Sequence, residues 1–317
     1  MPSINAIKQR RGVVMNMKQA MKAMNLVSTA KLRKARERWG NTLPFLEGVD
    51  KIMLDAAKSP LTAENIFVRR RDTLHKNAGY IVIASDRGKC GSYNINICKA
   101  VIEHAGTRGS NALILPVGSR GLDYFLSQSM NIHRVLGGMP EAPSYEDAEA
   151  IGRQILADFC TDNKAFGELD EIYIAFTKYR TVLNLEPVIV PVLPISLRFG
   201  NEPGISIKTN TKTNTETSIE TSTKGFFPDA EPSEMEYDPD VDSFLGYMAP
   251  MYLNVQIYGA MLESALCEQA ARMVATDTAT NNADELIESL TLLYNRQRQG
   301  IITQEITEIV SGASALT

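Results

Sequence analysis

The longest periodic pattern in the chain lies at its C-terminal end. Apolar residues recur there every three or four positions, from Met248 through Leu290 to Ile309, and no proline follows Pro250. This spacing predicts one continuous helix over residues 243–317. A helix of more than sixty residues would be roughly 95 Å long. Because that length exceeds the width of an ordinary domain, the helix needs a partner along its side.

A second helical pattern opens the chain and covers residues 1–58, with Ser3 or Asn5 as the N-cap. Reading in heptads, we predict one seam position at Ile7, Val14, Met21, Ser28 and Ala35. The second seam position is predicted at Arg10, Met17, Met24 and Lys31, and the stripe is widened by Val13, Ala20 and Val27. Pro44 is expected to kink or interrupt this helix.

Between the two helices, strand-like and helix-like segments alternate. Short apolar runs at residues 79–85, 112–117 and 132–136 are typical of strands buried on both faces. Helical patterns are predicted at residues 93–105 and 144–160, and a further one follows residues 118–121 and runs to about Ser127. Residues 171–178 and 187–195 read as two antiparallel strands. The alternation predicts a three-layer α/β domain with a mixed sheet over residues 75–200.

Residues 201–242 have a different composition. Seven threonines fall within residues 205–224, and residues 231–242 are acidic and rich in proline. Such a segment has little to bury, which favours a flexible loop or an exposed ribbon. We therefore predict four parts: an N-terminal helix (1–58), an α/β domain (75–200), a low-complexity and acidic linker (201–242) and a C-terminal helix (243–317).

Charge changes the interpretation of the two helices. Residues 1–38 carry ten Lys or Arg against one acid, whereas residues 250–317 carry eight acids against three arginines. The ends of the chain are therefore electrostatically complementary, although the net charge is only −4. Antiparallel pairing would bury both apolar stripes and place opposite charges face to face. The fold class is thus α/β plus a long antiparallel α-helical coiled coil.

Composition also excludes several function classes. The four cysteines form no C-x-x-C pair and the three histidines lack ligand spacing, so we expect neither a disulfide framework nor a metal site. No apolar run reaches the length of a membrane span, and the basic N-terminus lacks the apolar core of a signal peptide. These features indicate the cytosolic side of a bacterial cell.

Several motifs, in the same order along the chain, resemble those of the gamma subunit of F-type ATP synthases. The N-terminal helix contains IKQRR at residues 7–11, MKAM at 21–24 and AKLRKA at 30–35. The first turn of the α/β domain reads SDRGKCGSYN at residues 85–94. The C-terminal helix contains EQAARM at 268–273, ATNNA at 279–283, Arg298 with Gln299, and IVSGA at 309–313. The threonine-rich segment at residues 205–224 is longer than the turn usual in that family.

The resemblance implies a non-catalytic rotor subunit that transmits torque between an ion-driven membrane c-ring and the catalytic hexamer. The implied partners are the alpha, beta, epsilon and delta subunits and the c-ring. The implied location is the cytoplasmic side of the bacterial plasma membrane, peripheral to it, and no cofactor is implied. The coupling ion, a proton or sodium, is selected by other subunits.

The resemblance also implies contact residues. The residues expected to contact the beta subunits are Met24, Arg298, Gln299 and Thr303. A basic face of the shaft is expected at Lys31, Arg33, Lys34 and Arg36. Contacts of the α/β foot with epsilon and the c-ring are expected at Asp86, Arg87, Tyr237, Asp238 and Asp240.

Three alternatives compete with a rotor. The glycine turn at residues 86–91 follows a strand and opens a helix, as in nucleotide-binding folds, but it lacks a complete phosphate-binding motif. The basic N-terminal helix could contact nucleic acid, yet Trp39 is its only aromatic residue before Phe45 and offers no stacking platform. A non-rotary coiled-coil scaffold with a nucleotide-binding-like α/β domain is the third reading.

Overall fold

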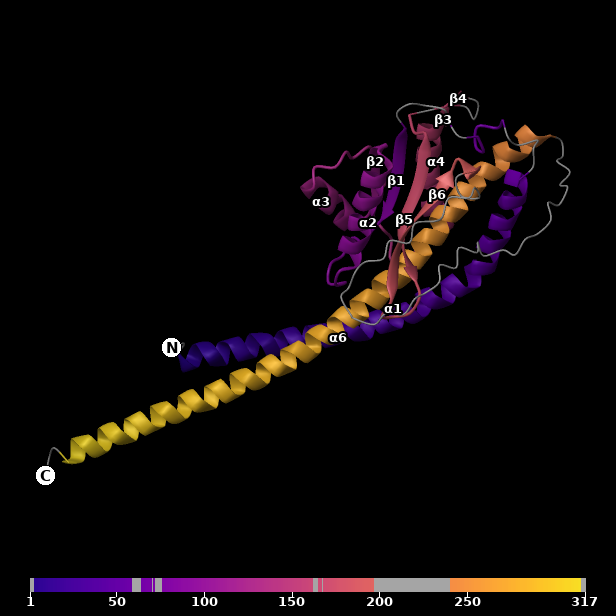
Figure 1. The fold of residues 1–317 in the computed structure, drawn as a ribbon. Helices are drawn as coiled ribbons and strands as arrows, with labels where there is room; N and C mark the ends of the chain where they lie inside the picture. The colour runs from indigo at the N-terminus through magenta and orange to yellow at the C-terminus, as the bar shows by residue number, and fades with distance from the viewer. Residues whose placement is uncertain are drawn as a thin grey trace, which may run out of the picture. The chain divides into compact units, whose positions relative to one another are not determined.

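The computed structural model describes residues 3–58, 64–69, 71, 76–161, 165–166, 168–196 and 240–314. The chain divides into two compact units. The helical unit comprises Met1–Ala30 and Arg272–Thr317, and the α/β unit comprises Lys31–Ala271. Two long helices, α1 (Ile4–Lys58) and α6 (Val241–Ser314), contribute segments to both units (Figure 1).

The α/β unit is built on a four-stranded mixed sheet in the order β2-β1-β5-β6. Strand β1 (Asn77–Ile83) pairs in parallel with both β2 (Asn111–Val117) and β5 (Glu171–Tyr179). Strand β6 (Leu185–Leu193) closes the sheet antiparallel to β5. The mixed sheet predicted from the sequence is therefore confirmed. The short strands β3 (Cys160–Thr161) and β4 (Ala165–Phe166) form a separate ribbon.

Helices cover both faces of this sheet, which explains why its strands are apolar on both sides. Helices α2 (Tyr93–Arg108) and α3 (Ser119–Ser127) pack on the face that carries Tyr80 and Tyr173. Helix α4 (Tyr145–Phe159) and the α1 and α6 segments of this unit pack on the face that carries Ile81 and Ile174. The result is the three-layer arrangement that strand–helix alternation predicts (Figure 1).

Helix α4 shows how local sequence fixes an element boundary. The Ser144 hydroxyl accepts the backbone N–H of Asp147, and the Asp147 carboxylate accepts the backbone N–H of Ser144 in return. This capping box satisfies two N–H groups that the first helical turn would otherwise leave unpaired.

One expectation about local structure is wrong, and of the two effects expected at Pro44, a kink or an interruption, the interruption is not found. Residues 132–136 form no strand in the described structure, because only Ile132 and Gly137 make isolated bridges to β2. Pro44 does not interrupt α1, which continues to Lys58. A proline removes one backbone hydrogen bond, and the buried contacts of Leu46, Val49 and Met53 on the next turns hold the helix across that gap.

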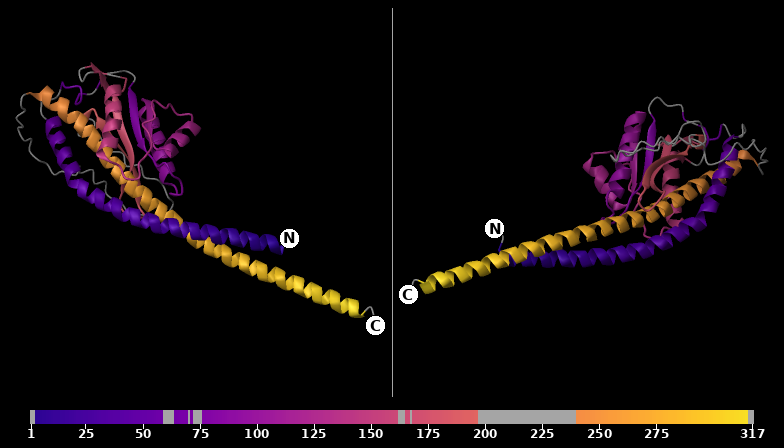
Figure 2. Two further views of the ribbon diagram at one scale, coloured as in Figure 1. Left: turned by 180° about the vertical axis from the view of Figure 1, so that it is seen from behind. Right: turned by 60° about the horizontal axis from the view of Figure 1, so that its bottom comes forward.

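In the helical unit the two helix segments run antiparallel, as predicted from their charge and periodicity (Figure 2). Ile7 and Val14 of α1 are buried against Leu290 of α6, with Ile287 and Tyr294 packed around them. Ser28 is also buried, so the first predicted seam position faces the partner helix.

The second predicted seam position is wrong at Arg10 and Met17, whereas Met24 and Lys31 are half-buried. Arg10 and Met17 are exposed, and so are Val13, Ala20 and Val27, which were expected to widen the stripe. The position that faces α6 lies one residue later and is polar: Arg11, Lys18 and Asn25. The Arg11 guanidinium lies 5.6 Å from the centre of the Tyr294 ring, Lys18 forms an ion pair with Asp284, and Asn25 Nδ2 donates to the Met273 carbonyl over 3.0 Å. A seam made of polar residues cannot be predicted from the spacing of apolar residues.

Candidate functional site

The turn after β1 is organised by the carboxylate of Asp86. One oxygen, Oδ1, accepts both the backbone N–H and the hydroxyl of Ser119 over 2.8 and 2.9 Å. The other, Oδ2, accepts the backbone N–H of Met139 over 2.9 Å. Asp86 therefore joins the end of β1 to the start of α3 and to the loop before α4.

The same turn carries the glycine-rich sequence that suggested a nucleotide site. Lys89 and Gly91 have φ values of 63° and 59°, and Asn94 Nδ2 donates to the Ser85 hydroxyl over 2.8 Å. The N-terminal N–H of α3 is already occupied by the Asp86 carboxylate. This N–H belongs to α3, whereas the glycine turn opens α2, so the contact weighs only against phosphate binding at the start of α3.

Two sets of predicted contact residues meet around Glu141, which the sequence did not single out. Lys31, from the predicted basic face, forms an ion pair with one Glu141 oxygen. Arg87, from the predicted foot contacts, lies 3.7 Å from the other. Arg87 and Glu141 are exposed and Lys31 is half-buried, so this cluster contributes little to stability but sets the local charge pattern.

The remaining residues of the basic face differ from Lys31. Arg33, Lys34 and Arg36 are exposed and make no ion pair with any described residue. Met24, in the helical unit, is half-buried.

The predicted contact residues of the C-terminal tail all lie on the surface of α6. Arg298, Gln299 and Thr303 are exposed, and the Thr303 hydroxyl donates to the Gln299 carbonyl over 2.9 Å. The same part of the helix exposes a run of apolar side chains: Ile301, Ile302, Ile306, Ile309 and Val310. Exposed apolar side chains of this size are typical of a surface that another protein covers.

Asp240 stands at the start of α6. Its carboxylate accepts the backbone N–H of Ser243 over 2.8 Å and the Ser243 hydroxyl over 2.9 Å, and these hydrogen bonds lower the pKa of Asp240. The residue is thus a helix cap with an exposed charge. Tyr237 and Asp238, predicted with it, lie outside the described residues, as does the threonine-rich segment at 205–224.

A buried junction joins the sheet to α6 inside the α/β unit. It consists of three hydrogen bonds: Tyr179 N–H to Glu263 Oε1 (2.9 Å), Tyr93 O–H to the Ser264 carbonyl (3.2 Å), and Cys267 S–H to the Thr177 carbonyl (3.2 Å). Burial raises the pKa values of both Tyr93 and Cys267 well above their ordinary range, so both side chains remain donors. Glu263 was not predicted as a site residue, because an acid in an acidic helix is expected to be exposed to solvent.

Neither a metal-binding cluster nor a membrane-spanning helix occurs among the residues that the structure describes. No group of three His, Cys, Asp or Glu side chains in this part of the chain gathers closely enough to hold a metal ion. Within the same residues, no helix combines the length and apolar character that a bilayer crossing requires.

Solved structures with a similar fold come from ATP synthases. A chain of the Euglena gracilis mitochondrial ATP synthase (OSCP/F1/c-ring, rotational state 3) aligns with a TM-score of 0.65 at 17% identity, covering 99% of this chain and 94% of that one. A chain of the Tetrahymena thermophila mitochondrial enzyme (central stalk/c-ring) aligns with a TM-score of 0.57 at 20% identity, covering 82% and 99%. At these identities the likeness shows a shared fold.

Sequence relatives are closer. A family model described as ATP synthase matches residues 3–316. The chain is 37% identical to the sodium-ion-specific ATP synthase gamma chain of Acetobacterium woodii, over 99% of both proteins. It is 35% identical to the gamma chain of Ruminiclostridium cellulolyticum over 99% of both, and 33% identical to that of Staphylococcus epidermidis over the full length of both. The chain therefore belongs to the ATP synthase gamma chain family.

Proposed function

We propose that the chain is the central-stalk rotor subunit of a bacterial F-type ATP synthase. In this role it transmits torque between the ion-driven c-ring and the hexamer of alpha and beta subunits. Rotation of the chain thereby couples ion transport to ATP synthesis or hydrolysis. The observation that carries the proposal is similarity along the whole chain, since relatives named ATP synthase gamma chain align over at least 99% of both sequences.

The paired helices support a mechanical role. In the helical unit, an apolar seam and a polar seam bind two antiparallel helices together. Two helices joined in this way resist bending and slippage better than one, because each deformation must break contacts between them. In the α/β unit, the buried junction around Glu263 and Cys267 joins α6 to the sheet.

The chain acts, on this proposal, as a non-catalytic subunit. The polar groups of the turn after β1 hold backbone atoms: Asp86 accepts three hydrogen bonds from Ser119 and Met139. A carboxylate engaged in this way fixes structure and is not poised for acid–base chemistry. Nucleotide chemistry would belong to the beta subunits, as the family resemblance implies.

The contact residues follow the same proposal. Met24, Arg298, Gln299 and Thr303 would engage the beta subunits, and exposure of the last three supports their availability. Lys31, Arg33, Lys34 and Arg36 would present a basic face to acidic loops of the hexamer or to polar loops of the c-ring. For Lys31, the ion pair with Glu141 would have to be exchanged for that contact.

The α/β domain would form the foot that meets epsilon and the c-ring. Asp86, Arg87, Tyr237, Asp238 and Asp240 are the residues proposed for this contact. Of these, Asp86 is half-buried and internally bonded, so Arg87 and Asp240 offer the more accessible charges. The foot would correspond to residues 75–200, joined by the linker 201–242 to the helix at 243–317 and paired with the helix at 1–58. The complex would hold the chain peripherally at the cytoplasmic face of the plasma membrane.

Affinity purification of the tagged chain from its own cells tests the proposal. We expect one copy of the chain for every three alpha and three beta subunits, with epsilon and the c-ring retained in mild detergent. ATPase activity should appear in the assembly and be absent from the isolated chain. Cells that express the tag alone provide the control. Recovery of the chain without any alpha or beta subunit would favour the scaffold alternative and reject a rotor.

A further inference from the structure

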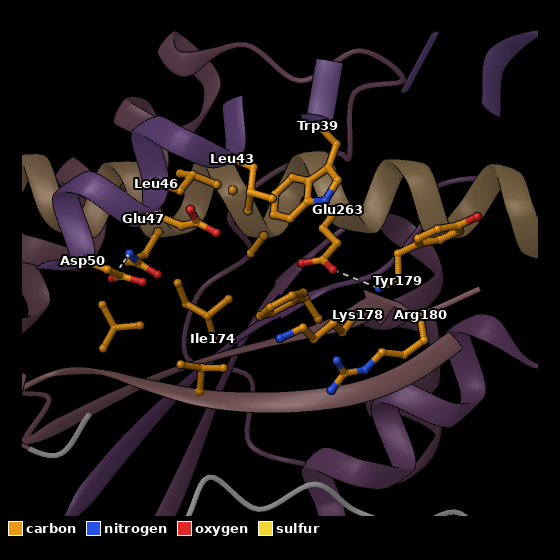
Figure 3. A pocket seen from close by; sticks show the side chains of 16 residues that line it. Trp39, Leu43, Leu46, Glu47, Asp50, Ile174, Lys178, Tyr179, Arg180 and Glu263 are labelled. Atoms are coloured by element: carbon orange, nitrogen blue, oxygen red, sulfur yellow. Dashed lines mark hydrogen bonds between the residues drawn. The ribbon is translucent and has the colours of Figure 1, made fainter. Parts of the chain in front are cut away.

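A pocket of about 400 Å³ lies inside the α/β unit, between α1, α6 and the sheet face formed by β5 and β6. Its walls are mainly apolar and include Phe176 of β5 and Val190 of β6. Trp39 and Leu43 of α1 form the wall opposite the sheet (Figure 3). Pockets of this volume, with apolar walls and a few convergent polar groups, are typical of small-molecule sites. The torque-transmitting role assigns no function to it.

The polar group that distinguishes this pocket is the carboxylate of Glu263. The residue is only 4% exposed, and Figure 3 shows its carboxylate directed into the pocket between Trp39 and the end of β5. One oxygen accepts the Tyr179 N–H over 2.9 Å, and no second hydrogen-bond partner for the carboxylate lies among the described residues. Burial raises the pKa of Glu263, against the lowering influence of that N–H, Lys178 and Arg180. A buried carboxylate with an unused oxygen favours a donor in the pocket.

The balance of charge around the pocket favours a cation. Three carboxylates and two cations line it: Glu47, Asp50, Glu263, Lys178 and Arg180. Arg180 is neutralised by Glu186, which does not line the pocket, through a contact of 3.0 Å between Nε and Oε2. Asp50 is likewise engaged, because it accepts Gln256 Nε2 over 2.8 Å, so Lys178 is left facing Glu47 and Glu263. An anionic ligand would meet net repulsion here, whereas a cation would reduce it.

Trp39 adds a second feature that suits a cation. Its indole ring lies beside the Glu263 carboxylate in the pocket wall (Figure 3). No described Lys or Arg occupies the face of this ring. An indole face is the strongest aromatic partner for an ammonium group, and a carboxylate on the other side strengthens that contact.

We propose that this pocket binds a small organic cation, an amine that carries a compact apolar body. The ammonium group donates to the unused oxygen of Glu263 and lies against Trp39, with Glu47 as the nearby counter-charge on α1. The apolar body packs against Phe176 and Val190 of the sheet. Such a ligand would contact α1, α6 and β5 at once. The inference does not depend on the proposed rotor function.

Trp39 makes the site directly measurable, because it is the single tryptophan of the chain. We would titrate the full-length protein with adamantan-1-amine, which is cationic at pH 7 and transparent where tryptophan is excited. Adamantane-1-carboxylate has the same apolar cage with the opposite charge and serves as the matched ligand. We expect a saturable change in Trp39 fluorescence with the amine, with a dissociation constant of about 1 mM or lower, and no saturable change with the carboxylate.

Substitution of Glu263 tests the assigned contact. Glu263→Gln keeps an oxygen for the Tyr179 N–H but removes the charge, so affinity for the amine should fall about tenfold or more. Glu103→Gln, an exposed acid on α2, makes the same change in net charge away from the pocket and should bind as the parent does. If Glu263→Gln melts well below the parent, Glu47→Gln replaces it, with a smaller loss expected. Equal responses to the amine and the carboxylate would overturn the proposal, as would full affinity in the properly folded Glu263→Gln protein.

Discussion

Asp86 is the single side chain on which the turn after β1 most depends. Its carboxylate accepts three hydrogen bonds, two of them from backbone N–H groups of Ser119 and Met139. Asp86→Ala would leave these donors unpaired, and we expect the free energy of unfolding to fall by about 2–3 kcal/mol. Urea denaturation of the full-length chain measures the change. Asp123→Ala, which removes an exposed acid from α3, should cost less than about 0.5 kcal/mol, and equal losses in the two variants would contradict the assignment.

Alanine substitutions at two helical glycines should change the stability of the protein in opposite directions. A Cβ added at Gly152 of α4 would lie 1.9 Å from Asn254 Oδ1 of α6, whereas one added at Gly106 of α2 would meet nothing within 4 Å. Gly152→Ala should therefore destabilise the protein by about 1–3 kcal/mol, because Asn254 is buried and must move. Gly106→Ala should stabilise it by about 0.5–1 kcal/mol through helix propensity. Thermal unfolding measures the stability of both variants. A change in the same direction in both would contradict the packing argument.

At the scale of elements, the contact between α2 and the sheet contains a pH-sensitive group. His104 is 5% exposed, and its Nδ1 lies 2.9 Å from the hydroxyl of Tyr80. Burial and the nearby Arg108 lower the pKa of His104 from 6.5 to about 4. The Tyr80 pKa is raised to about 12 by burial, so its hydroxyl stays protonated and shares this hydrogen bond with the neutral imidazole. Arg108, in turn, lies over the Tyr173 ring and 3.5 Å from Glu171.

Because the folded state binds the His104 proton more weakly than the unfolded state, stability must depend on pH. The contribution is fully present above pH 6.5 and is lost as the pH falls toward about 4, by at most about 3 kcal/mol. His104→Gln keeps an acceptor for Tyr80 but cannot titrate. Its unfolding free energy, measured by urea titration at several pH values, should fall less steeply between pH 6.5 and 4 than that of the parent. Parallel curves would show that His104 is not the group responsible.

The elements themselves could largely be predicted from the sequence, and their contacts less so. Apolar runs placed the strands of the sheet within a few residues because both faces of each strand are buried. The helix pair was predicted from periodicity and charge, but half of its seam was not. Met17 is apolar and exposed while Lys18 faces α6 and pairs with Asp284. Hydrophobicity alone does not distinguish a side chain that contacts the partner helix from one that is exposed on another face.

The candidate site shows the same limit for long-range contacts. Lys31 and Arg87 were singled out by family resemblance, yet their common partner Glu141 lies in a loop with no pattern of its own. Glu263 looks like one more acid in an acidic helix, and only packing against β5 buries it. Burial and pairing of charges depend on residues far away in the chain, which local sequence does not specify.

At the scale of the whole molecule, we expect the C-terminal end of α6 to matter for assembly of the complex and little for folding of this chain. Every side chain described from residue 298 to residue 311 is exposed, so these residues contribute little to the fold of this chain. Deleting residues 298–317 should change the unfolding free energy of the α/β unit by less than about 0.5 kcal/mol. The same deletion removes the apolar run around Ile306 and Ile309, so ATP synthesis by the complex should fall by about tenfold or more.

Point variants sharpen this test, because Arg298 and Arg296 are both exposed arginines two positions apart on one helix. Residues two apart point to different faces, so only one of them can occupy a given contact. Arg298→Glu should reduce coupling of ATP hydrolysis to ion pumping in membrane vesicles, whereas Arg296→Glu should leave it near the parental level. Equal losses would show that charge, and not position, matters at this end of the helix. Normal synthesis by the truncated complex would remove Arg298, Gln299 and Thr303 from the beta-subunit contact altogether.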